Sequence, residues 1–573
     1  MKIYTSPYPP VPLVHESVFT NLFRTHFNEH PPDAPAFIDA ATGFTITRAG
    51  TCDLSLSFAH GLRHAFSELG GVPLARGDVV MVFSPNSIAW APMMFGGWAA
   101  GLRLTLANSS YTPREVAHQW KDSGAKTVLV HPALLPVVLD AFKLVHVDTS
   151  EARRRIVVID WQTSHGSARP GEFICMTDLM DKGRLSEEEK FLGEQAHETT
   201  LLCYSSGTTG KPKGVETTHH NLTSMFDMAA ITFPKLSNPN PRMLAMLPLY
   251  HIYGIIKLLG CQLHRGVPLV IMEKFEPVAF CRAIQDHKVT QAFIVPPVCV
   301  VLSQHPAVEQ FNLTSLEWLL CAAAPLSQQL LMMTNDRLHS VGARVSITQG
   351  YGLTETSPTL TFQDTDSYLR KAGSVGSLLP NLEARLVVDD TRDAAEGEAG
   401  ELWVRGPTVF KGYLNKPEAT RNAITPEGWF KTGDIAIRDS EGYYTIVDRL
   451  KELIKYKGFQ VPPAELEGVL IEHPDIADAG VVGVYSDVEA TELPRQVAIR
   501  DCQCLGCTAY RDCRAYVVPA RKLTPGEKKE FAESVEKWVR SKLARHKYLR
   551  GGVIVVDAIP KRQVLIFHRL MSV

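Results

Sequence analysis

The sequence predicts an α/β protein in which a large N-terminal α/β domain carries a β-rich subdomain and is followed by a small C-terminal α+β domain. At 573 residues the chain is too long for one hydrophobic core, so at least two domains are expected. Short β-rich runs such as VVMVF and QAFIV alternate with helix-like segments of about 10 to 15 residues, which indicates a mostly parallel sheet.

The elements are expected in a definite order along the chain. VVMVF is followed by the helix-like SIAWAPMMFGGWAAGL and REVAHQWKDSG, and the strand-like KTVLVH, RIVVID, TLLCYS, PLVIM and QAFIVPP come after them. From about Gly373 to Arg449, glycines, turns and short strands dominate (AGELWVRG, FKGYL, GWFKTGD, GYYTIVDR), which indicates the β-rich subdomain. After it PAELEGVLIEHP and EFAESVEKWVRSKLA read as helices, and ADAGVVGVY and RAYVVP as strands. We therefore expect domains at residues 1–450 and 451–573.

Composition and charge narrow the function classes. Hydrophobic residues make up 45% and charged residues 21%, with a formal net charge of −2, so no nucleic-acid or membrane-surface partner is expected. The most apolar stretch, VVMVFSPNSIAWAPMMFGGWAAGL, is interrupted by Pro85 and Pro92, so it predicts a buried strand and a buried helix instead of a membrane span. The N-terminus has no apolar secretory core, which favours an intracellular location.

The 11 cysteines fall into two groups. Seven are scattered, mostly in apolar surroundings, and are interpreted as small core residues: Cys52, Cys175, Cys203, Cys261, Cys281, Cys299 and Cys321. The other four are crowded into one short segment: Cys502, Cys504, Cys507 and Cys513.

A glycine- and hydroxyl-rich loop, YSSGTTGKPKGV, runs from Tyr204 to Val215 after the apolar run TLLCYS. Such a loop can aim backbone N–H groups and hydroxyls at phosphate oxygens, and Lys211 and Lys213 add positive charge. Pro212 follows Gly-Lys where a P-loop needs Ser or Thr, so that pattern fails. Taken alone, the loop is equally compatible with a flexible surface turn.

Further motifs add chemistry suited to a nucleotide. QGYGLTETSP places Thr354 and Glu355 after a Gly-rich turn, and a carboxylate beside a phosphate site is a usual ligand of Mg²⁺. GWFKTGD ends in Asp434, interpreted as a free carboxylate in a turn that accepts from two ribose hydroxyls. The segment VDRLKELIKYKGFQVPPAELE gathers four basic residues, although a charge run alone is usually only a solvated face. These are Arg449, Lys451, Lys455 and Lys457.

Together these motifs resemble the adenylate-forming superfamily, and within it the 4-coumarate–CoA ligase-type enzymes. The resemblance rests on the loop YSSGTTGKPKG, on QGYGLTE and KELIKYKGFQVPPAELE, and on LPLYHIYG, CAAAPL and GELWVRG. It runs nearly end to end along the chain. It implies an AMP-forming carboxylate–CoA ligase that uses ATP, Mg²⁺ and CoA: a carboxylate attacks the α-phosphate, and the CoA thiol then displaces AMP. It also implies that the C-terminal domain is mobile and rotates between the two half-reactions, with a hinge near Lys451.

The same resemblance assigns roles to individual residues. Thr354 is expected at the α-phosphate and Glu355 at the Mg²⁺, while His251 is a gate beside the acyl pocket and Tyr253 part of its wall. The residues implied to bind ATP or AMP are Ser205, Ser206, Gly207, Thr208, Thr209, Lys213, Ala323, Gln349, Gly350, Tyr351, Asp434, Arg449 and Lys451. Those implied to face the site in one domain orientation are Lys455 and Gln460, and those implied to meet CoA are Lys274, Lys457 and Gly458.

The C-terminus departs from the family pattern. The family usually ends on IPK-x-x-x-GK-I-x-R, whose second lysine bridges the carboxylate and the α-phosphate, whereas this chain has Leu565 and Ile566 at the Gly-Lys positions. Loss of one positioned electrostatic donor is expected to slow adenylation by roughly 10²–10³-fold or more. This loss leaves one alternative open, a catalytically impaired nucleotide-binding homologue. A second alternative is luciferase-like oxidation of an acyl-adenylate, since an adenylate on the same fold can be oxidised instead of thioesterified.

An atypical insertion occupies residues 496–514, QVAIRDCQCLGCTAYRDCR, where the family runs almost directly from ELPR to AYVVP. Its four cysteines allow a zinc site, although their spacing fits the usual paired knuckles poorly. A plain surface loop is a second interpretation. The hypothesis we favour is a translated intron, and reading through a splice site would also explain the unusual C-terminus.

The substrate and location are only outlined by the sequence. The segments MLPLYHIYGIIK, FIVPPVCVV and CAAAPLSQQ are mainly apolar, which favours an aryl or medium-chain fatty acid over acetate or an amino acid. The expected location is cytoplasmic or peroxisomal, although the C-terminal MSV is not a Ser-Lys-Leu peroxisomal signal.

Overall fold

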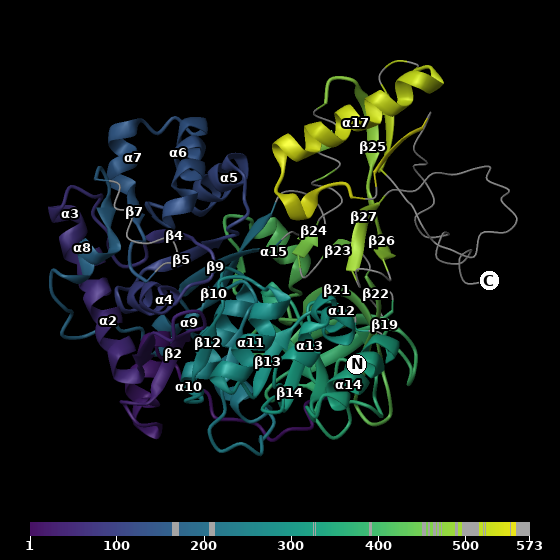
Figure 1. Cartoon of the computed structure of the whole chain (residues 1–573), viewed down its shortest axis with the longest axis horizontal. Helices are drawn as coiled ribbons and strands as arrows, with labels where there is room; N and C mark the ends of the chain where they lie inside the picture. Colours follow the sequence, from purple (N-terminus) through teal and green to yellow (C-terminus); the bar gives the residue numbers. More distant parts are fainter. Residues whose placement is uncertain are drawn as a thin grey trace, which may run out of the picture. The chain divides into compact units, whose positions relative to one another are not determined.

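The structure is a computed structural model of the chain (Figure 1). It describes residues 1–162, 171–205, 212–324, 326, 328–388, 392–449, 454–456, 459–461, 466, 469–470, 473–486, 491–495, 515–519, 521, 523–550 and 552–556. The chain divides into two compact units, residues 1–205 with 213–450 and residues 206–212 with 451–573.

The first unit contains an eight-stranded sheet that ends in an antiparallel hairpin. In spatial order its strands are β20 (Gly412–Tyr413), β10 (Lys213–Thr218), β9 (Thr199–Ser205), β5 (Arg103–Ala107), β4 (Val79–Phe83), β6 (Thr127–Val130), β7 (Ile156–Val158) and β8 (Ile174–Cys175). The strands from β9 to β8 pair in parallel, whereas β10 pairs antiparallel with both β9 and β20. The glycine-rich loop therefore joins the two strands of the hairpin.

Helices cover both faces of this sheet, as its apolar strands require. On β4, Val79, Met81 and Phe83 face one apolar cluster, while Val80 and Val82 face another, because successive side chains point to opposite faces. The first cluster includes side chains of α5 (Pro113–Ser123), α6 (Leu135–Leu144) and α7 (Thr149–Arg155), and the second includes side chains of α2 (Arg48–His60) and α4 (Trp90–Ala99). In Figure 1 these two sets of helices lie on opposite sides of β4 and β5. Every residue of β4 and α4 is buried, so the expected buried strand and buried helix are confirmed.

The first unit also contains a nine-stranded sheet. Its strands in order are β17 (Ser377–Leu378), β16 (Thr359–Phe362), β15 (Ser346–Gly352), β14 (Trp318–Cys321), β13 (Gln291–Ile294), β11 (Met243–Ala245), β12 (Leu269–Ile271), β2 (Pro35–Asp39) and β3 (Thr45–Thr47). The six strands from β15 to β2 are parallel, and the edges are antiparallel. The predicted α/β class with mostly parallel sheet is confirmed.

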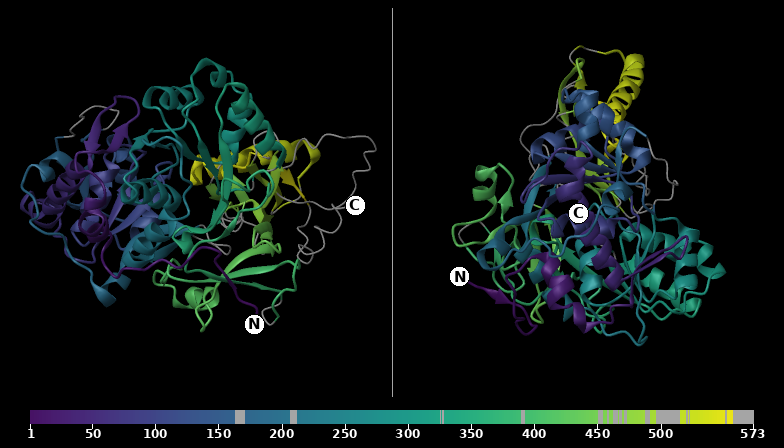
Figure 2. Two further views of the ribbon diagram at one scale, coloured as in Figure 1. Left: turned by 90° about the horizontal axis from the view of Figure 1, so that it is seen from below. Right: turned by 90° about the vertical axis from the view of Figure 1, so that its left-hand side faces the viewer.

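The β-rich subdomain is a five-stranded antiparallel sheet. It contains β1 (Tyr4–Thr5), β18 (Glu383–Val387), β19 (Gly400–Arg405), β21 (Phe430–Arg438) and β22 (Tyr444–Arg449). The N-terminal end of the chain lies beside it in both views of Figure 2, because β1 pairs with β18. One expectation was wrong: the strand of FKGYL, β20, pairs with β10 of the eight-stranded sheet and not with this subdomain.

In the second unit the structure describes small sheets and a long helix. Its strands are β23 (Ile454–Tyr456), β24 (Phe459–Val461), β25 (Ile476–Gly480), β26 (Val482–Ser486), β27 (Thr491–Arg495), β28 (Ala515–Pro519) and β29 (Val553–Val555). Helix α17 (Pro525–Lys542) begins with a capping box between Thr524 and Glu527 and buries Val535 and Val539 against these strands. The predicted α+β class of this part is confirmed; the insertion at 496–514 and the chain after Val556 lie outside the described residues.

Among the described residues, no helix is both long enough and apolar enough to cross a bilayer. The seven scattered cysteines are buried, and none of them forms a disulfide with another described cysteine, which confirms their interpretation as core residues.

Candidate nucleotide-binding site

The predicted adenine-side residues lie at the carboxyl ends of two neighbouring parallel strands. Cys321 at the end of β14 pairs in register with Gln349 on β15, so the loop that holds Ala323 and the segment from Gln349 to Tyr351 share one edge of the sheet. Ligands of open α/β sheets bind at this edge. Ala323 has φ of +69°, a conformation that residues other than glycine seldom adopt and that often marks a ligand-binding turn.

Gln349 is fixed by hydrogen bonds on its backbone and side chain. Its N–H donates to Gln363 Oε1 (3.0 Å), and its own Oε1 accepts from the backbone N–H of Leu326 (3.4 Å). The side chain is buried. The loop after β14 is therefore tied to β15 through this amide.

The carboxylate predicted to hold Mg²⁺ is buried and fixed by two hydroxyls. Glu355 Oε1 accepts from Ser205 Oγ (2.8 Å) at the end of β9 and from the Tyr413 hydroxyl (3.0 Å) on β20. The Glu355 carbonyl also accepts from the Phe410 N–H (2.9 Å). Both of these side-chain bonds go to Oε1, and a buried carboxylate next to the end of β9 suits Mg²⁺.

The lysine at the end of the loop lies against the same tyrosine. Lys213 is directly opposite Ser205 across the β9–β10 hairpin, and its Nζ is 4.9 Å from the centre of the Tyr413 ring. Burial and the neighbouring Glu355 carboxylate raise the pKa of the Tyr413 hydroxyl, so it stays protonated and remains a donor. The structure thus brings together three predicted residues, Ser205, Lys213 and Glu355, around Tyr413.

The predicted ribose-binding carboxylate is placed differently from the expectation. Asp434 lies inside β21 and is 1% exposed, so it is not a free carboxylate in a turn. The strand continues through FKTGD because β21 pairs with both β19 and β22. The Tyr351 hydroxyl donates to Asp434 Oδ2 (2.5 Å), which joins two predicted nucleotide residues. Arg449 is the register partner of Asp434 on β22.

The predicted acyl-side residues occupy a turn that a buried asparagine holds. Asn86 Nδ2 donates to the carbonyls of Leu247 (2.9 Å) and Met272 (3.2 Å), and its Oδ1 accepts from the Leu249 N–H (2.8 Å). His251 Nδ1 accepts from the Tyr253 N–H (3.2 Å), and burial lowers the pKa of His251 to about 4. The imidazole is therefore neutral at pH 7.

Tyr253 presents an aromatic wall. Its ring stacks on Phe293 with centroids 5.6 Å apart and an interplanar angle of 10°. The hydroxyl is buried and has no hydrogen-bond partner among the residues that the structure describes. A buried unsatisfied hydroxyl is costly, so this atom suits a polar group on a bound molecule.

The remaining predicted residues are placed only in part. Thr354 is buried at the start of the turn Thr354–Thr356, directly before Glu355, and Gly350 lies on β15. Lys274 is exposed after β12, and Lys455 and Gln460 are register partners in the β23–β24 hairpin. The predicted residues outside the described part are Ser206, Gly207, Thr208, Thr209, Lys451, Lys457 and Gly458.

Three residues of this site were missed by sequence reasoning: Tyr413, Gln363 and Asn86. Tyr413 sits in FKGYL, which was assigned to the subdomain, so nothing linked it to Glu355. Asn86 had a usable signal, since a polar residue three positions after the wholly buried strand β4 needs hydrogen-bond partners. Gln363 gave none, because its role depends on the pairing of β15 with β16.

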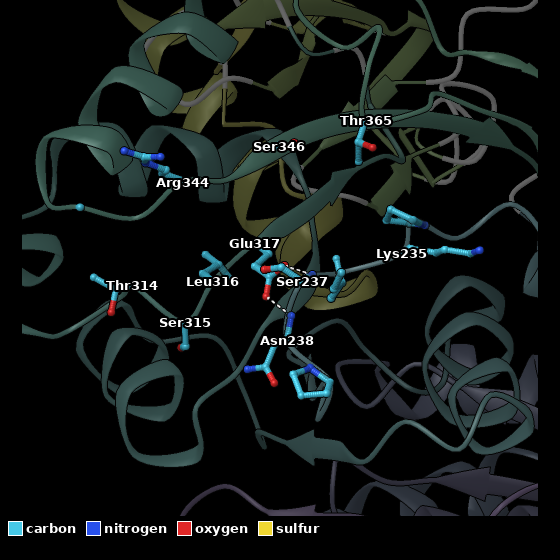
Figure 3. Close-up of a pocket in the computed structure, with 14 residues that line it drawn as sticks. Lys235, Ser237, Asn238, Thr314, Ser315, Leu316, Glu317, Arg344, Ser346 and Thr365 are labelled. Atoms are coloured by element: carbon cyan, nitrogen blue, oxygen red, sulfur yellow. Dashed lines mark hydrogen bonds between the residues drawn. The ribbon is translucent and has the colours of Figure 1, made fainter.

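A polar hollow of about 720 Å³ lies at the amino ends of strands in the nine-stranded sheet, opposite the carboxyl ends that carry the predicted adenine-side residues (Figure 3). It is lined by Glu317 before β14 and Ser346 at the start of β15, so it faces the amino ends of these strands. The Glu317 carboxylate accepts from Ser237 N–H (2.6 Å) and Oγ (2.8 Å) and from Asn238 N–H (3.0 Å). These bonds clamp a loop, and no predicted site residue lines the hollow.

Comparison with known proteins decides the family. The model of the AMP-binding enzyme family matches residues 23–414. The chain belongs to the AMP-binding enzyme family. It is 32% identical to "Probable 4-coumarate–CoA ligase 1" of Dictyostelium discoideum over 97% of this chain and 95% of that protein. It is 34% identical to "4-coumarate–CoA ligase 1" of Petroselinum crispum over 92% of this chain and 89% of that protein.

Solved structures agree with this family assignment. A malonyl-CoA ligase in complex with methylmalonyl-CoA and AMP superposes with a TM-score of 0.70 at 26% identity, covering 93% of this chain and 97% of that one. An o-succinylbenzoate CoA synthetase from Bacillus subtilis has a TM-score of 0.74 at 24% identity, covering 95% and 96%, and supports the fold. The family resemblance inferred from the motifs is confirmed.

Proposed function

We propose that this chain is an AMP-forming carboxylate–CoA ligase that activates an aryl or medium-chain fatty acid. A carboxylate oxygen attacks the α-phosphorus of ATP and pyrophosphate leaves, which gives an acyl-adenylate. The CoA sulfur then attacks the acyl carbon and AMP leaves, which gives the thioester. The observation that carries the proposal is the buried Glu355 carboxylate, fixed by Ser205 and Tyr413 where the hydroxyl-rich loop joins β9.

The first half-reaction brings two anions together, so it depends on charge neutralisation and alignment more than on covalent chemistry. Lys213 begins β10 at the end of the loop and supplies positive charge for the phosphates. When bound, Mg²⁺ would neutralise phosphate charge, and Glu355 is the residue that would hold it. Ser205 and Tyr413 keep that carboxylate in one orientation, so little reorganisation is needed when ATP binds.

The nucleoside end would be held by the linked residues of β15 and β21. Asp434 accepts from Tyr351, and as a buried carboxylate it has acceptor capacity for ribose hydroxyls. Ala323 and Gln349 lie together at the carboxyl edge of β14 and β15, where we assign the adenine.

The acyl pocket favours an aromatic acid. Tyr253 and Phe293 offer stacked rings, the Tyr253 hydroxyl needs a partner, and His251 is neutral and adds no charge near an apolar substrate. We assign His251 as the gate of this pocket, Lys274 with Lys457 and Gly458 as the CoA contacts, and Lys451 as the hinge of a mobile C-terminal domain.

The test is AMP release by the full chain with ATP, Mg²⁺ and CoA against a panel of aryl, medium-chain and short-chain acids. We expect release that requires both CoA and an acid, with the highest kcat/KM for aryl or medium-chain acids. Glu355→Gln should abolish most of it. Equal rates for acetate, or an unchanged rate in Glu355→Gln, would contradict the assignment.

A second candidate is a catalytically impaired homologue that binds nucleotide without efficient turnover. Its support is Ile566, which stands where the family has a lysine, at a position outside the described residues. Pyrophosphate exchange with the same acids separates the two candidates. An Ile566→Lys variant that gains about 10²-fold or more in exchange would favour impairment, whereas full activity in the unmodified chain would dismiss it.

A further inference from the structure

A second cluster of ionisable side chains lies outside the nucleotide site, in the first unit. His26 follows the helical turn Asn21–Thr25, Asp227 lies on α9 (His219–Ala230), and His264 ends α10 (Cys261–His264). His264 Nε2 is 3.3 Å and His26 Nε2 is 3.8 Å from Asp227 Oδ1. One ligand atom from each of the three residues lies within 4.8 Å of the other two.

These side chains are mostly buried, yet their nitrogens lack hydrogen bonds. The exposed fractions are 7% for His264, 13% for Asp227 and 19% for His26. Among the described residues, neither ring nitrogen of His264 has a hydrogen-bond partner, and neither does His26 Nε2. Buried polar atoms are normally satisfied, so the two unpartnered Nε2 atoms that lie near Asp227 Oδ1 point to a missing ligand.

The spacing suits a tetrahedral metal centre. Zinc binds nitrogen at about 2.0–2.1 Å and carboxylate oxygen at about 2.0–2.2 Å, so two ligand atoms of one tetrahedral ion lie about 3.3–3.5 Å apart. The observed 3.3 Å and 3.8 Å are close to this value. The ring centroids of His26 and His264 are 4.5 Å apart, and the two ring planes meet at 58°. Because the planes intersect, one ion can lie in the plane of both rings.

The outer contact of His26 also matches a metal site. His26 Nδ1 is 2.7 Å from Glu29 Oε1, so Nδ1 carries the proton and donates it to this carboxylate, and Nε2 keeps its lone pair on the side of Asp227. Ligating histidines usually make such a bond with their other nitrogen. The two carboxylates would offset the charge of a divalent cation.

We propose that His26, Asp227 and His264 bind a divalent transition-metal ion of the Zn²⁺ class, with solvent in the fourth position. The ion would join the segment that holds His26 to helices α9 and α10. Because it binds only the folded chain, it would stabilise this part of the first unit by mass action. The alternative is an ion pair between His264 and Asp227 without a metal, and Co²⁺ and Zn²⁺ binding distinguishes this ion pair from a metal site.

A histidine trio elsewhere serves as a comparison. His15, His197 and His220 also lie within 4.8 Å of one another through one atom each. His15 and His220, however, stack at 4.4 Å with an interplanar angle of only 6°, so one ion cannot lie in the planes of both rings. The protein used in the test must still lack an intact trio, because exposed histidines bind added metal weakly and would obscure the result.

The test is Co²⁺ and Zn²⁺ binding to nucleotide-free full chain after dialysis against chelator. A background variant removes the other metal-binding groups with His15→Ala, Cys502→Ser, Cys504→Ser, Cys507→Ser and Cys513→Ser. We expect one equivalent of Co²⁺ with the strong visible absorption of four-coordinate cobalt and no thiolate charge-transfer band. Zn²⁺ should displace it and raise the unfolding temperature.

Two substitutions in this background carry the decision. Asp227→Asn should abolish both the cobalt spectrum and the Zn²⁺-dependent rise in unfolding temperature. Glu29→Gln, at a side chain that is 55% exposed and tolerant of change, should weaken binding by about 10–100-fold. Asp140→Asn, an exposed carboxylate paired with Lys143, should change nothing.

The proposal fails if the background variant binds no metal, or if Asp227→Asn binds as tightly as its parent. If Asp227→Asn does not fold, Glu29→Gln decides, and an affinity equal to that of Asp140→Asn would overturn the proposal.

Discussion

Replacing Tyr413 by phenylalanine removes a single hydroxyl from the carboxylate assigned to Mg²⁺. That hydroxyl donates to Glu355 Oε1 at 3.0 Å, and its raised pKa keeps it a donor throughout the working pH range. Phenylalanine keeps the ring that Lys213 Nζ approaches to 4.9 Å, so the cation–π contact is retained. Any effect therefore reports the hydrogen bond to Glu355.

The expected fall in kcat/KM follows from the charge of the Glu355 carboxylate, which accepts this hydrogen bond. A hydrogen bond to a charged group is worth about 1.5–3 kcal/mol, and each 1.4 kcal/mol is about tenfold in rate. Ser205 Oγ still donates at 2.8 Å, so Glu355 keeps one of its two restraints. We therefore expect the lower half of the range, a fall of about 10–40-fold in kcat/KM for ATP.

The assay is pyrophosphate release with a saturating acid, repeated over a Mg²⁺ titration. Tyr413→Phe should need more Mg²⁺ for half-maximal rate, while the KM for the acid stays unchanged. Tyr443→Phe is the matched control, because the Tyr443 hydroxyl also donates to a carboxylate at 2.7 Å, but to Asp364 and not to Glu355. An unchanged Mg²⁺ dependence in Tyr413→Phe, or an equal loss in the control, would refute the reasoning.

Three further predictions follow from single contacts. Asp434→Asn weakens the buried acceptor that Tyr351 meets at 2.5 Å, so AMP affinity measured by calorimetry should fall by about 10-fold or more, and unchanged affinity would remove Asp434 from the ribose site. In Gly352→Ala the new Cβ would lie 1.8 Å from the Pro358 carbonyl oxygen, so denaturant unfolding should show a loss of about 1–3 kcal/mol or more; wild-type stability would show that this backbone can move. Burial lowers the pKa of His219 from 6.5 to about 3, so the unfolded chain takes up this proton first as the pH falls, and stability should decline from about pH 6.5 toward pH 3. His219→Asn should make that decline shallower, and an identical acid profile would contradict it.

Local sequence patterns predicted the large-scale fold well. The fully apolar VVMVF and the long apolar segment after it became β4 and α4, and REVAHQWKDSG became α5 to within one residue at each end. These segments carry their own periodicity or burial, so no distant contact was needed to recognise them. The strand β1 was missed because two residues have no pattern of their own and pair with β18 about 380 positions away.

The candidate site shows the same limit at the level of single residues. Ser205, Lys213 and Glu355 were named from motifs, and the structure brings them together. Tyr413 was missed and Asp434 was misjudged for one reason: each depends on strand pairing between distant segments, β20 with β10 and β21 with β22. Register of this kind is fixed by tertiary packing, which a local motif does not encode.

Full chain supplied with ATP, Mg²⁺ and one aryl acid, and then with CoA, tests the ligase assignment most directly. The separate products to be measured are pyrophosphate before CoA is added, and AMP with acyl-CoA afterwards. We predict one pyrophosphate per enzyme-bound adenylate in the first stage, followed by equal amounts of AMP and thioester in the second. The assignment would be contradicted if the chain bound AMP but released no pyrophosphate with any acid of the panel, both in its unmodified form and as Ile566→Lys.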